Sequence, residues 1–231
     1  MSNENQGVQG VREKVLMCWS GGKDSAFALH ELRQSGRYEV VALLTTVNSQ
    51  FGRVSMHGVR REMLEAQARA LELPLHVVEL YGKVSMEEYA EKMRESLQEF
   101  LAAGVWQAAF GDLFLEDVRS YREKNLQKVG MKALFPLWGC NTAHLAREFL
   151  ELGFRAVVVT VDAKVLDESF AGRPFDESFL KDLPAGVDPC AENGEFHSFV
   201  FDGPGFRQPV AWRLGEKVTR EGFVYCDILP A

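Results

Sequence analysis

The sequence predicts an α/β fold, with a doubly wound parallel sheet followed by a smaller α+β C-terminal domain. Three observations support this prediction. Between Lys14 and Val161, short β-rich runs alternate with amphipathic helical stretches, which is the pattern of βα units around a parallel sheet. A glycine-containing turn joins the first of these runs directly to the first helix. With 231 residues, of which 46% are hydrophobic, the chain can bury a core of this size.

The predicted elements of the first domain follow one another in a regular order. Strands are expected where runs of apolar and β-branched residues occur, at residues 15–19, 40–47, 75–80, 105–110 and 156–161. Helices are expected between them, at residues 25–35, 59–73, 85–103, 116–129 and 142–152. In the third helix, apolar residues including Tyr89 and Met93 recur at steps of three and four, and we assign that face to the core.

Beyond Val161 the regular alternation stops. Residues 162–189 are rich in Asp, Glu, Gly and Pro, and only a short helix is expected there, at residues 176–181. Strand-like runs return at residues 196–202, 210–213 and 223–228, which predicts a small antiparallel element. We therefore divide the chain into residues 1–132 and residues 133–231.

Composition excludes several classes of protein. The formal net charge of -7 and the pI near 5.4 provide no general field for nucleic acid or anionic membranes. No apolar run approaches the roughly 20 residues that span a bilayer, and residues 1–14 lack a signal-peptide core. The cysteines form no CxxC pair, so neither a zinc knuckle nor a redox dithiol is indicated. We expect a cytoplasmic protein that has no membrane contact and for which nucleic acid is a disfavoured partner.

The segment Ser20-Gly21-Gly22-Lys23-Asp24-Ser25 joins the first predicted strand to the first helix. It therefore lies where anions bind in open α/β sheets, at the carboxyl end of a strand and the N-terminus of a helix. The two glycines let the backbone approach phosphate oxygens, the two serines add hydroxyl donors, and Lys23 adds a positive charge. We interpret this segment as a nucleotide phosphate loop. The alternative is a glycine turn that only caps the helix.

The order of residues in this loop argues against kinase-like or GTPase-like chemistry. A Walker A motif needs GxxxxGK followed by Ser or Thr, whereas Asp24 follows Lys23 here. An acid beside the lysine would repel a triphosphate unless a cation bridges the two, so we infer a Mg²⁺ ion that is held partly by Asp24.

Two further strand ends provide candidate ligands at the same edge of the sheet. Thr45 and Thr46 end the second strand, where backbone groups would read an adenine, although both are also ordinary strand residues. Gly111 permits a close approach after the fourth strand, and Asp112 is available for a metal or a ribose. The alternative for this pair is a simple turn or a helix cap.

A cluster of polar residues near the C-terminus is the second candidate for chemistry. Glu192, Glu195 and His197 lie within six residues, beside Gly194. Such acids can bind a cationic substrate, hold ammonium or accept its proton, since only neutral ammonia attacks an activated carbonyl. The alternative is an acidic hairpin turn with a capping histidine.

The loop and several other segments carry a resemblance to known proteins. The sequence SGGKDS after the first strand resembles the PP-loop of the ATP-pyrophosphatase superfamily, whose members activate a carboxylate or carbonyl as an adenylate. Over nearly the whole chain, the order of further motifs is similar to that of the diphthine–ammonia ligase family. These motifs are Met56-His57-Gly58-Val59-Arg60, Gly111-Asp112, Pro136-Leu137-Trp138-Gly139, Leu166-Asp167-Glu168-Ser169, Gly172-Arg173 and Glu192-Asn193-Gly194-Glu195-Phe196-His197.

Trp19 and the segment 111–117 resemble a bacterial branch of that family, whose substrate is unknown. Ala191 and Ser198 stand where family members often have Gly and Thr, which puts the detailed fit of the substrate in question.

The resemblance implies a PP-loop, Rossmann-like ATP-binding domain at residues 1–132 and a substrate domain at residues 133–231. It implies an AMP-forming ligase that adenylates a carboxylate, releases pyrophosphate and transfers ammonia to give an amide. The expected cofactors are ATP and Mg²⁺. The residues that we expect to take part are, for catalysis, Lys23, Asp24, Glu192, Glu195 and His197; for ATP, residues 20–25, Thr45, Thr46, His57, Gly111 and Asp112; and for metal, Asp24 and Asp112.

The expected partners are ATP and ammonia, with elongation factor 2 as the carrier of diphthine if the source is archaeal or eukaryotic. A homodimer is an open alternative to a monomer. Two other functions are kept as alternatives. One is a PP-loop enzyme that modifies tRNA, against which the acidic charge and the missing CxxC weigh. The other is a sensor that binds ATP without turnover.

Overall fold

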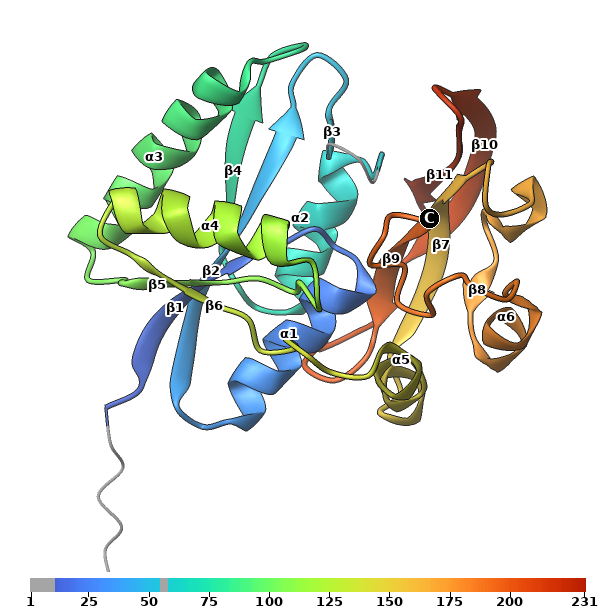
Figure 1. The fold of residues 1–231 in the computed structure, drawn as a ribbon, viewed down its shortest axis with the longest axis horizontal. Helices are drawn as coiled ribbons and strands as arrows, with labels where there is room; N and C mark the ends of the chain where they lie inside the picture. The colour runs from blue at the N-terminus through green and yellow to red at the C-terminus, as the bar shows by residue number, and fades with distance from the viewer. Residues whose placement is uncertain (1–10, 55–57) are drawn as a thin grey trace, which may run out of the picture.

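A computed structural model describes residues 11–54 and 58–231, and it has two sheets side by side (Figure 1). The first sheet has six strands: β1 (Glu13–Cys18), β2 (Tyr38–Asn48), β3 (Arg53–Val54), β4 (Leu75–Leu80), β5 (Gln107–Ala109) and β6 (Lys132–Leu134). All neighbours pair in parallel except β3, which pairs antiparallel to the end of β2. β1 lies between β2 and β5, so the chain winds outward from the centre in both directions.

Four helices cover the two faces of this sheet: α1 (Lys23–Gln34), α2 (Arg61–Ala70), α3 (Met86–Ala102) and α4 (Glu116–Lys128). Val15 and Met17 of β1 share one core with α1 and α2, whereas Leu16 belongs to a second core with α3 and α4. Because successive strand residues point to opposite faces, this division puts one helix pair on each face. The prediction of an α/β fold with a doubly wound parallel sheet is confirmed.

The second sheet has five antiparallel strands: β7 (Arg155–Asp162), β8 (Pro174–Phe175), β9 (Phe196–Asp202), β10 (Trp212–Arg220) and β11 (Phe223–Pro230). Three short helical elements accompany it: α5 (Thr142–Glu151), the 3-10 helix η1 (Glu168–Phe170) and α6 (Glu177–Asp182). In this part of the chain the expected mixture of α and β structure is present.

The strand predicted at residues 156–161 was assigned to the wrong sheet. It is β7, which pairs antiparallel with β9 and β11 rather than extending the parallel sheet. Its residues from Ala156 to Val161 are all buried, and a continuous apolar run fits a central strand of either kind of sheet. The parallel sheet instead ends with β6, a strand of three residues that the sequence pattern did not reveal.

The strand predicted at residues 210–213 was also misplaced, because β10 begins at Trp212 and continues to Arg220. β10 is an edge strand that pairs only with β11 among the described strands, and most of its residues are exposed. Because residues on both faces of β10 are exposed, its sequence lacks the alternation of apolar and polar residues that marks a half-buried strand.

The apolar face of α3 is only partly core. Leu97 is its one buried residue, and Met86 is 61% exposed. Tyr89 and Met93 pack against the second core, and they also line a cavity at the edge of the sheet. The assignment of this whole face to the core was therefore wrong for the end of α3 that lies nearest to the cavity.

The two sheets share one hydrophobic core. The ring of Phe27 in α1 lies 6.3 Å from that of Phe149 in α5 and 6.0 Å from that of Phe154 before β7. In the described part of the chain, no helix has the length and apolar character needed to cross a bilayer. The division at residues 132 and 133 remains a proposal.

Candidate nucleotide site

A cavity of about 470 Å³ lies at the carboxyl ends of β1, β2 and β5. Ser20, Asp24 and Ser25 line it from the predicted phosphate loop, and Thr45 and Thr46 line it from the end of β2. The opposite wall comes from the second sheet and the segment before it. That wall contains Ala191, Glu192, Gly194 and His197. The cavity thus brings together the two groups of residues that the sequence singled out.

Close contacts with α2 and hydrogen bonds within the loop itself hold the phosphate loop in shape. Gly21 has a φ of 81°, and a Cβ atom added there would lie 2.6 Å from Leu64 and 2.8 Å from Gln67. The Ser20 hydroxyl lies 3.1 Å from the Ser25 hydroxyl, which donates to the carbonyl of Gly22 at 2.9 Å. Gly22 is the N-cap of α1 and provides no side chain to cap the helix, so the first turn can receive an anion.

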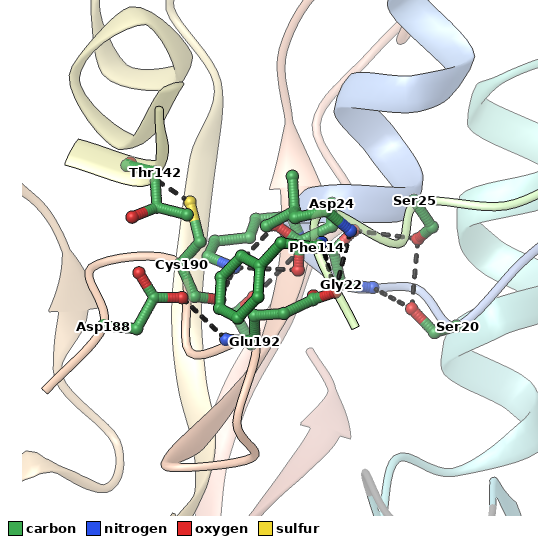
Figure 2. Close-up of polar contacts among 12 residues, drawn as sticks. Ser20, Gly22, Asp24, Ser25, Phe114, Thr142, Asp188, Cys190 and Glu192 are labelled. Carbon is green, nitrogen blue, oxygen red and sulfur yellow. Dashed lines mark hydrogen bonds and ion pairs between the residues drawn. The ribbon is translucent and has the colours of Figure 1, made fainter. Parts of the chain in front are cut away.

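Lys23 is buried at the base of the loop, with 3% of its surface exposed. Its Nζ lies 2.7 Å from Oδ1 and 2.8 Å from Oδ2 of Asp24, and it donates to the carbonyl of Cys190 (Figure 2). Burial lowers the pKa of Lys23, but Asp24, Cys190 and Asp188 together raise it more, and the net direction is upward. The positive charge that we predicted for Lys23 is therefore fixed in place, where it connects the loop to residues 188–192.

Asp112 lies beside the loop and is neutralised by an arginine that the sequence analysis did not select. Arg122 of α4 places Nη2 3.1 Å from Oδ1 and Nε 2.7 Å from Oδ2 of Asp112. The guanidinium also lies 4.4 Å from the centre of the Phe110 ring. Both side chains line the cavity, so Arg122 is a second positive group beside the position expected for phosphates.

Gly111 allows β5 to approach the start of α1. A Cβ atom at this position would lie 2.7 Å from the carbonyl carbon of Asp24 and 2.9 Å from the amide nitrogen of Ser25. These neighbours are backbone atoms of the phosphate loop, which cannot move without changing the loop itself. The close approach that we predicted for Gly111 is therefore one between the end of β5 and the phosphate loop.

Replacing Gly111 with alanine is expected to distort the loop. Overpacking of this kind costs roughly 1–3 kcal/mol, and we expect the melting temperature to fall by roughly 5 °C and the Kd for ATP to rise about tenfold. Thermal unfolding followed by circular dichroism and ATP titration would measure both effects. Gly104→Ala is the control, because a Cβ there meets nothing within 4 Å, although its φ of 79° adds local strain. Unchanged ATP affinity in Gly111→Ala would contradict this account.

The end of β2 offers an unpaired polar atom to a ligand. Thr45 is 3% exposed, and its Oγ1 has no hydrogen-bond partner within residues 11–54 and 58–231. Thr45 and Thr46 both line the cavity. A buried hydroxyl without a partner is costly, so a ligand that supplies one would be favoured here. This hydroxyl and the open first turn of α1 both fit a nucleotide.

Glu192 links the second sheet's side of the cavity to the end of β5. Its Oε1 accepts a hydrogen bond from the backbone N–H of Leu113 at 2.7 Å and of Phe114 at 3.3 Å. Its own N–H donates to Asp188 at 2.8 Å (Figure 2). Burial raises the pKa of the Glu192 carboxyl group. The residue therefore both shapes the cavity and lines it.

Glu195 and His197 lie at different depths. Glu195 is 6% exposed, and its Oε1 accepts from the N–H of Asp188 at 3.1 Å and from the amide of Asn193 at 3.0 Å. Glu195 is absent from the described cavity lining, so its side chain lies behind the residues that form the wall. His197 lines the cavity, and burial lowers the pKa of its imidazole to about 4. The histidine is therefore neutral at pH 7.

One predicted ligand cannot be assessed, because His57 lies outside the described residues. Arg60, three residues further on, forms an ion pair with Asp227 of β11 at 2.7 Å. Within the described residues, no group of three or more His, Cys, Asp or Glu side chains has the arrangement of a metal site. The carboxylates of Asp24 and Asp112 both face the cavity, and Mg²⁺ commonly takes one or two carboxylates together with substrate phosphates.

Several residues that shape the site were missed by the sequence analysis. Gln67 of α2 is fully buried, accepts from the Trp19 indole at 2.9 Å and donates to the carbonyls of Gly21 at 2.9 Å and Val200 at 2.6 Å. Ser198 of β9 accepts from the backbone N–H of Lys23 at 3.1 Å. These contacts join residues far apart in the chain, so no local pattern marks them.

The fold and this cavity define an α/β protein of the PP-loop type, in which a strand, a glycine loop and a helix form an anion site. Comparison with family models is more specific. Residues 13–133 match the diphthamide synthase N-terminal domain, and residues 141–229 match the diphthamide synthase C-terminal domain. The chain belongs to the diphthamide synthase family, as its motifs indicated.

Individual relatives agree with this assignment. The chain is 25% identical to the diphthine–ammonia ligase of Bos taurus over 93% of its own length and 88% of the relative. It is 26% identical to the Homo sapiens protein of the same name, with the same coverage of both chains. Among solved structures, a predicted subunit of tRNA methyltransferase from Methanocaldococcus jannaschii aligns with a TM-score of 0.46 and 20% identity. That alignment covers 83% of this chain and 98% of the other.

Proposed function

We propose that this chain is an ATP-dependent ligase that adenylates a carboxylate and transfers ammonia to it, releasing AMP and pyrophosphate. The observation that carries the proposal is the composition of the cavity. Its phosphate side is the loop at residues 20–25, and its opposite wall carries Glu192 and His197. The names of the curated relatives support the reaction class, because both are diphthine–ammonia ligases.

In the first step, a carboxylate oxygen of the acceptor attacks the α-phosphorus of ATP. The bond from that phosphorus to the α,β-bridging oxygen breaks, and pyrophosphate departs. The first turn of α1 and the guanidinium of Arg122 would stabilise the negative charge that collects on the leaving group. Lys23 would keep the loop in register with residues 188–192 through its bonds to Asp24 and Cys190.

In the second step, neutral ammonia attacks the carbonyl carbon of the adenylate. The bond to the AMP oxygen breaks, and a proton must leave the new amide nitrogen. Burial raises the pKa of the Glu192 carboxyl group, so its carboxylate would accept this proton. Burial lowers the pKa of His197 to about 4, so the neutral imidazole would orient the ammonia rather than take up its proton. Glu192 lies on the same wall and would hold an ammonium ion or a cationic part of the acceptor.

We propose that Mg²⁺ is held by Asp24 and Asp112 together with phosphate oxygens when ATP is bound. The ion would supply positive charge to the triphosphate. Each carboxylate is already paired with a cation, Asp24 with Lys23 and Asp112 with Arg122. A metal would therefore share these carboxylates. Diphthine as the acceptor and elongation factor 2 as its carrier are further proposals, which the family of the chain supports. A homodimer stays an open alternative to a monomer.

The proposed reaction can be tested by following ATP labelled at the α-phosphate. The full chain is incubated with Mg²⁺, ammonium and elongation factor 2 that carries diphthine, and the products are separated. The expected result is one AMP for each amide formed. Formation of ADP would overturn the proposal. ATP binding without AMP in the presence of this acceptor would instead support a sensor, and AMP release that depends on RNA would support tRNA modification.

Replacing Glu195 with glutamine is expected to separate the two steps. The side chain organises residues 188–193 from behind the cavity wall and does not line the phosphate loop. We therefore expect the Kd for ATP to change less than twofold and amide formation to fall about tenfold or more. Glu177→Gln, on the exposed face of α6, is the control. Equal losses of ATP affinity and amide formation would refute this division.

A further inference from the structure

A second cavity of about 650 Å³ lies beside the nucleotide cavity and has no role in the reaction described so far. It is formed by the carboxyl end of β2, by β3, and by the hairpin of β10 and β11. One wall therefore comes from the first sheet and the other from the second. Its volume falls within the range of sites for small ligands and side chains, roughly 300–1,000 Å³.

The half-buried part of this cavity is a cluster of two arginines and one aspartate. Arg53 places Nη1 2.8 Å and Nη2 3.0 Å from the Asp227 carboxylate, and Arg60 places Nη2 2.7 Å from it. Burial alone would raise the pKa of Asp227, but the two guanidinium groups lower it to about 2. The carboxylate is therefore ionised. Arg60 also has a second acidic neighbour, because its Nη1 lies 3.8 Å from Glu62, which is outside the cavity lining.

Two more cations line the exposed part of the cavity. Lys83 and Arg220 are exposed, and within the described chain neither side chain has a hydrogen bond or ion pair. Glu216 and Glu221 lie on the hairpin side and are also exposed. With Asp227, the lining has four basic and three acidic side chains, a net charge of +1. The chain as a whole has a net charge of -7, so the charge of this lining is opposite in sign to that of the chain.

The two cavities share β3 as a wall. Val54 lines the nucleotide cavity, and its neighbour Arg53 lines the second cavity. β2 extends along both, with Thr46 in the first and Asn48 in the second. Two strand residues span roughly 7 Å, so the second cavity adjoins the nucleotide cavity near Thr46, and a ligand anchored there would lie beside the nucleotide.

We propose that the second cavity binds an anionic group of the acceptor, a carboxylate or phosphate distinct from the carboxylate that reacts. Arg53 and Arg60 offer their remaining N–H groups to this anion, while Lys83 and Arg220 attract it from solvent. The Tyr225 ring closes the side of the cavity near Gly58, where a Cβ atom would lie 2.9 Å from the ring. This inference rests on the proposed function, because it assigns the cavity to that reaction's acceptor.

The first test measures anion binding directly. The nucleotide cavity is first filled with an ATP analogue that has a methylene group between the α- and β-phosphates. Inorganic phosphate or succinate is then titrated by calorimetry. We expect saturable binding that weakens about tenfold in the double variant Lys83→Gln, Arg220→Gln. Both residues lack described partners, so their replacement should leave the fold intact. Arg213→Gln is the matched control, because Arg213 is also exposed on β10 and lies outside the described cavity lining.

The second test uses the ligase assay with the diphthine-bearing acceptor. The double variant is expected to raise the KM for the acceptor about tenfold while the Kd for ATP and the kcat stay within twofold. An unchanged acceptor KM, or phosphate binding equal in the double variant and the unmodified protein, would overturn the inference. Failure of the proposed function has a different signature, namely that no AMP forms in any variant, and the anion titration still reports on the cavity in that case.

Discussion

Replacing Lys23 with methionine is expected to lower AMP formation at least about 100-fold, equivalent to about 2.7 kcal/mol of transition-state stabilisation. Methionine matches the length of the lysine stem but cannot donate a hydrogen bond. The variant loses the bond to the Cys190 carbonyl and leaves Asp24 without its cation. The Asp24 carboxylate would then face the triphosphate with its full negative charge, and the wall at residues 188–192 would lose its tie to the loop.

The measurement is the rate of AMP release from labelled ATP, with thermal unfolding as a check on the fold. Lys14→Met on β1 is the control, because Lys14 is exposed and lies one strand-length from the cavity. The predicted pattern is a large loss for Lys23→Met and none for Lys14→Met. If Lys23→Met kept more than a tenth of the activity, the ammonium group would have no essential role in the loop.

Replacing Gln67 with leucine is expected to be the most destabilising of these changes. The substitution preserves most of the volume but leaves the buried Trp19 N–H and the Val200 carbonyl without this partner. Each buried polar group left unpaired costs about 1–3 kcal/mol, which suggests about 2–6 kcal/mol for the two groups. For a chain of this size, the melting temperature should fall by roughly 4–24 °C. ATP binding should also weaken, because Gly21 loses a hydrogen bond at the centre of the loop.

Thermal unfolding with and without ATP would measure both effects. Gln98→Leu is the matched control, since Gln98 is the same residue type in a helix but is exposed. A difference of less than about 1 kcal/mol between the two variants would mean that the Gln67 amide does not hold the two sheets together.

The parts of the fold that follow local rules could be predicted from the sequence. β4 has the predicted bounds, and α3 begins one residue after Ser85, whose side chain accepts from the N–H of Glu88 as a helix cap does. Periodicity and capping act within a few residues, so a single sequence contains them. The phosphate loop was recognisable for the same reason, because its strand, turn and helix are contiguous.

What could not be predicted depends on contacts between distant segments. The choice of sheet for β7 depends on its pairing with β9 and β11, which follow it in the chain. The position of the Lys23 side chain depends on Cys190, 167 residues further on. Arg122 of α4 was not selected from the sequence, because its partner Asp112 lies ten residues earlier, beyond the start of the helix. Contacts of this kind cannot be recognised from the composition of a short stretch of sequence.

Because residues of β9 hold the phosphate loop, the site is complete only after β9 has been synthesised. The Gly21 carbonyl accepts a hydrogen bond from the N–H of Val200 at 2.9 Å, and the first N–H of α1 donates to the Ser198 hydroxyl. A ribosome releases all six strands of the parallel sheet before it makes these two residues. A nascent or truncated chain that ends before β9 would therefore contain the whole phosphate-loop sequence without the groups that hold it. The proposed ATP site is thus completed late in synthesis, when the opposite wall of the cavity is also present.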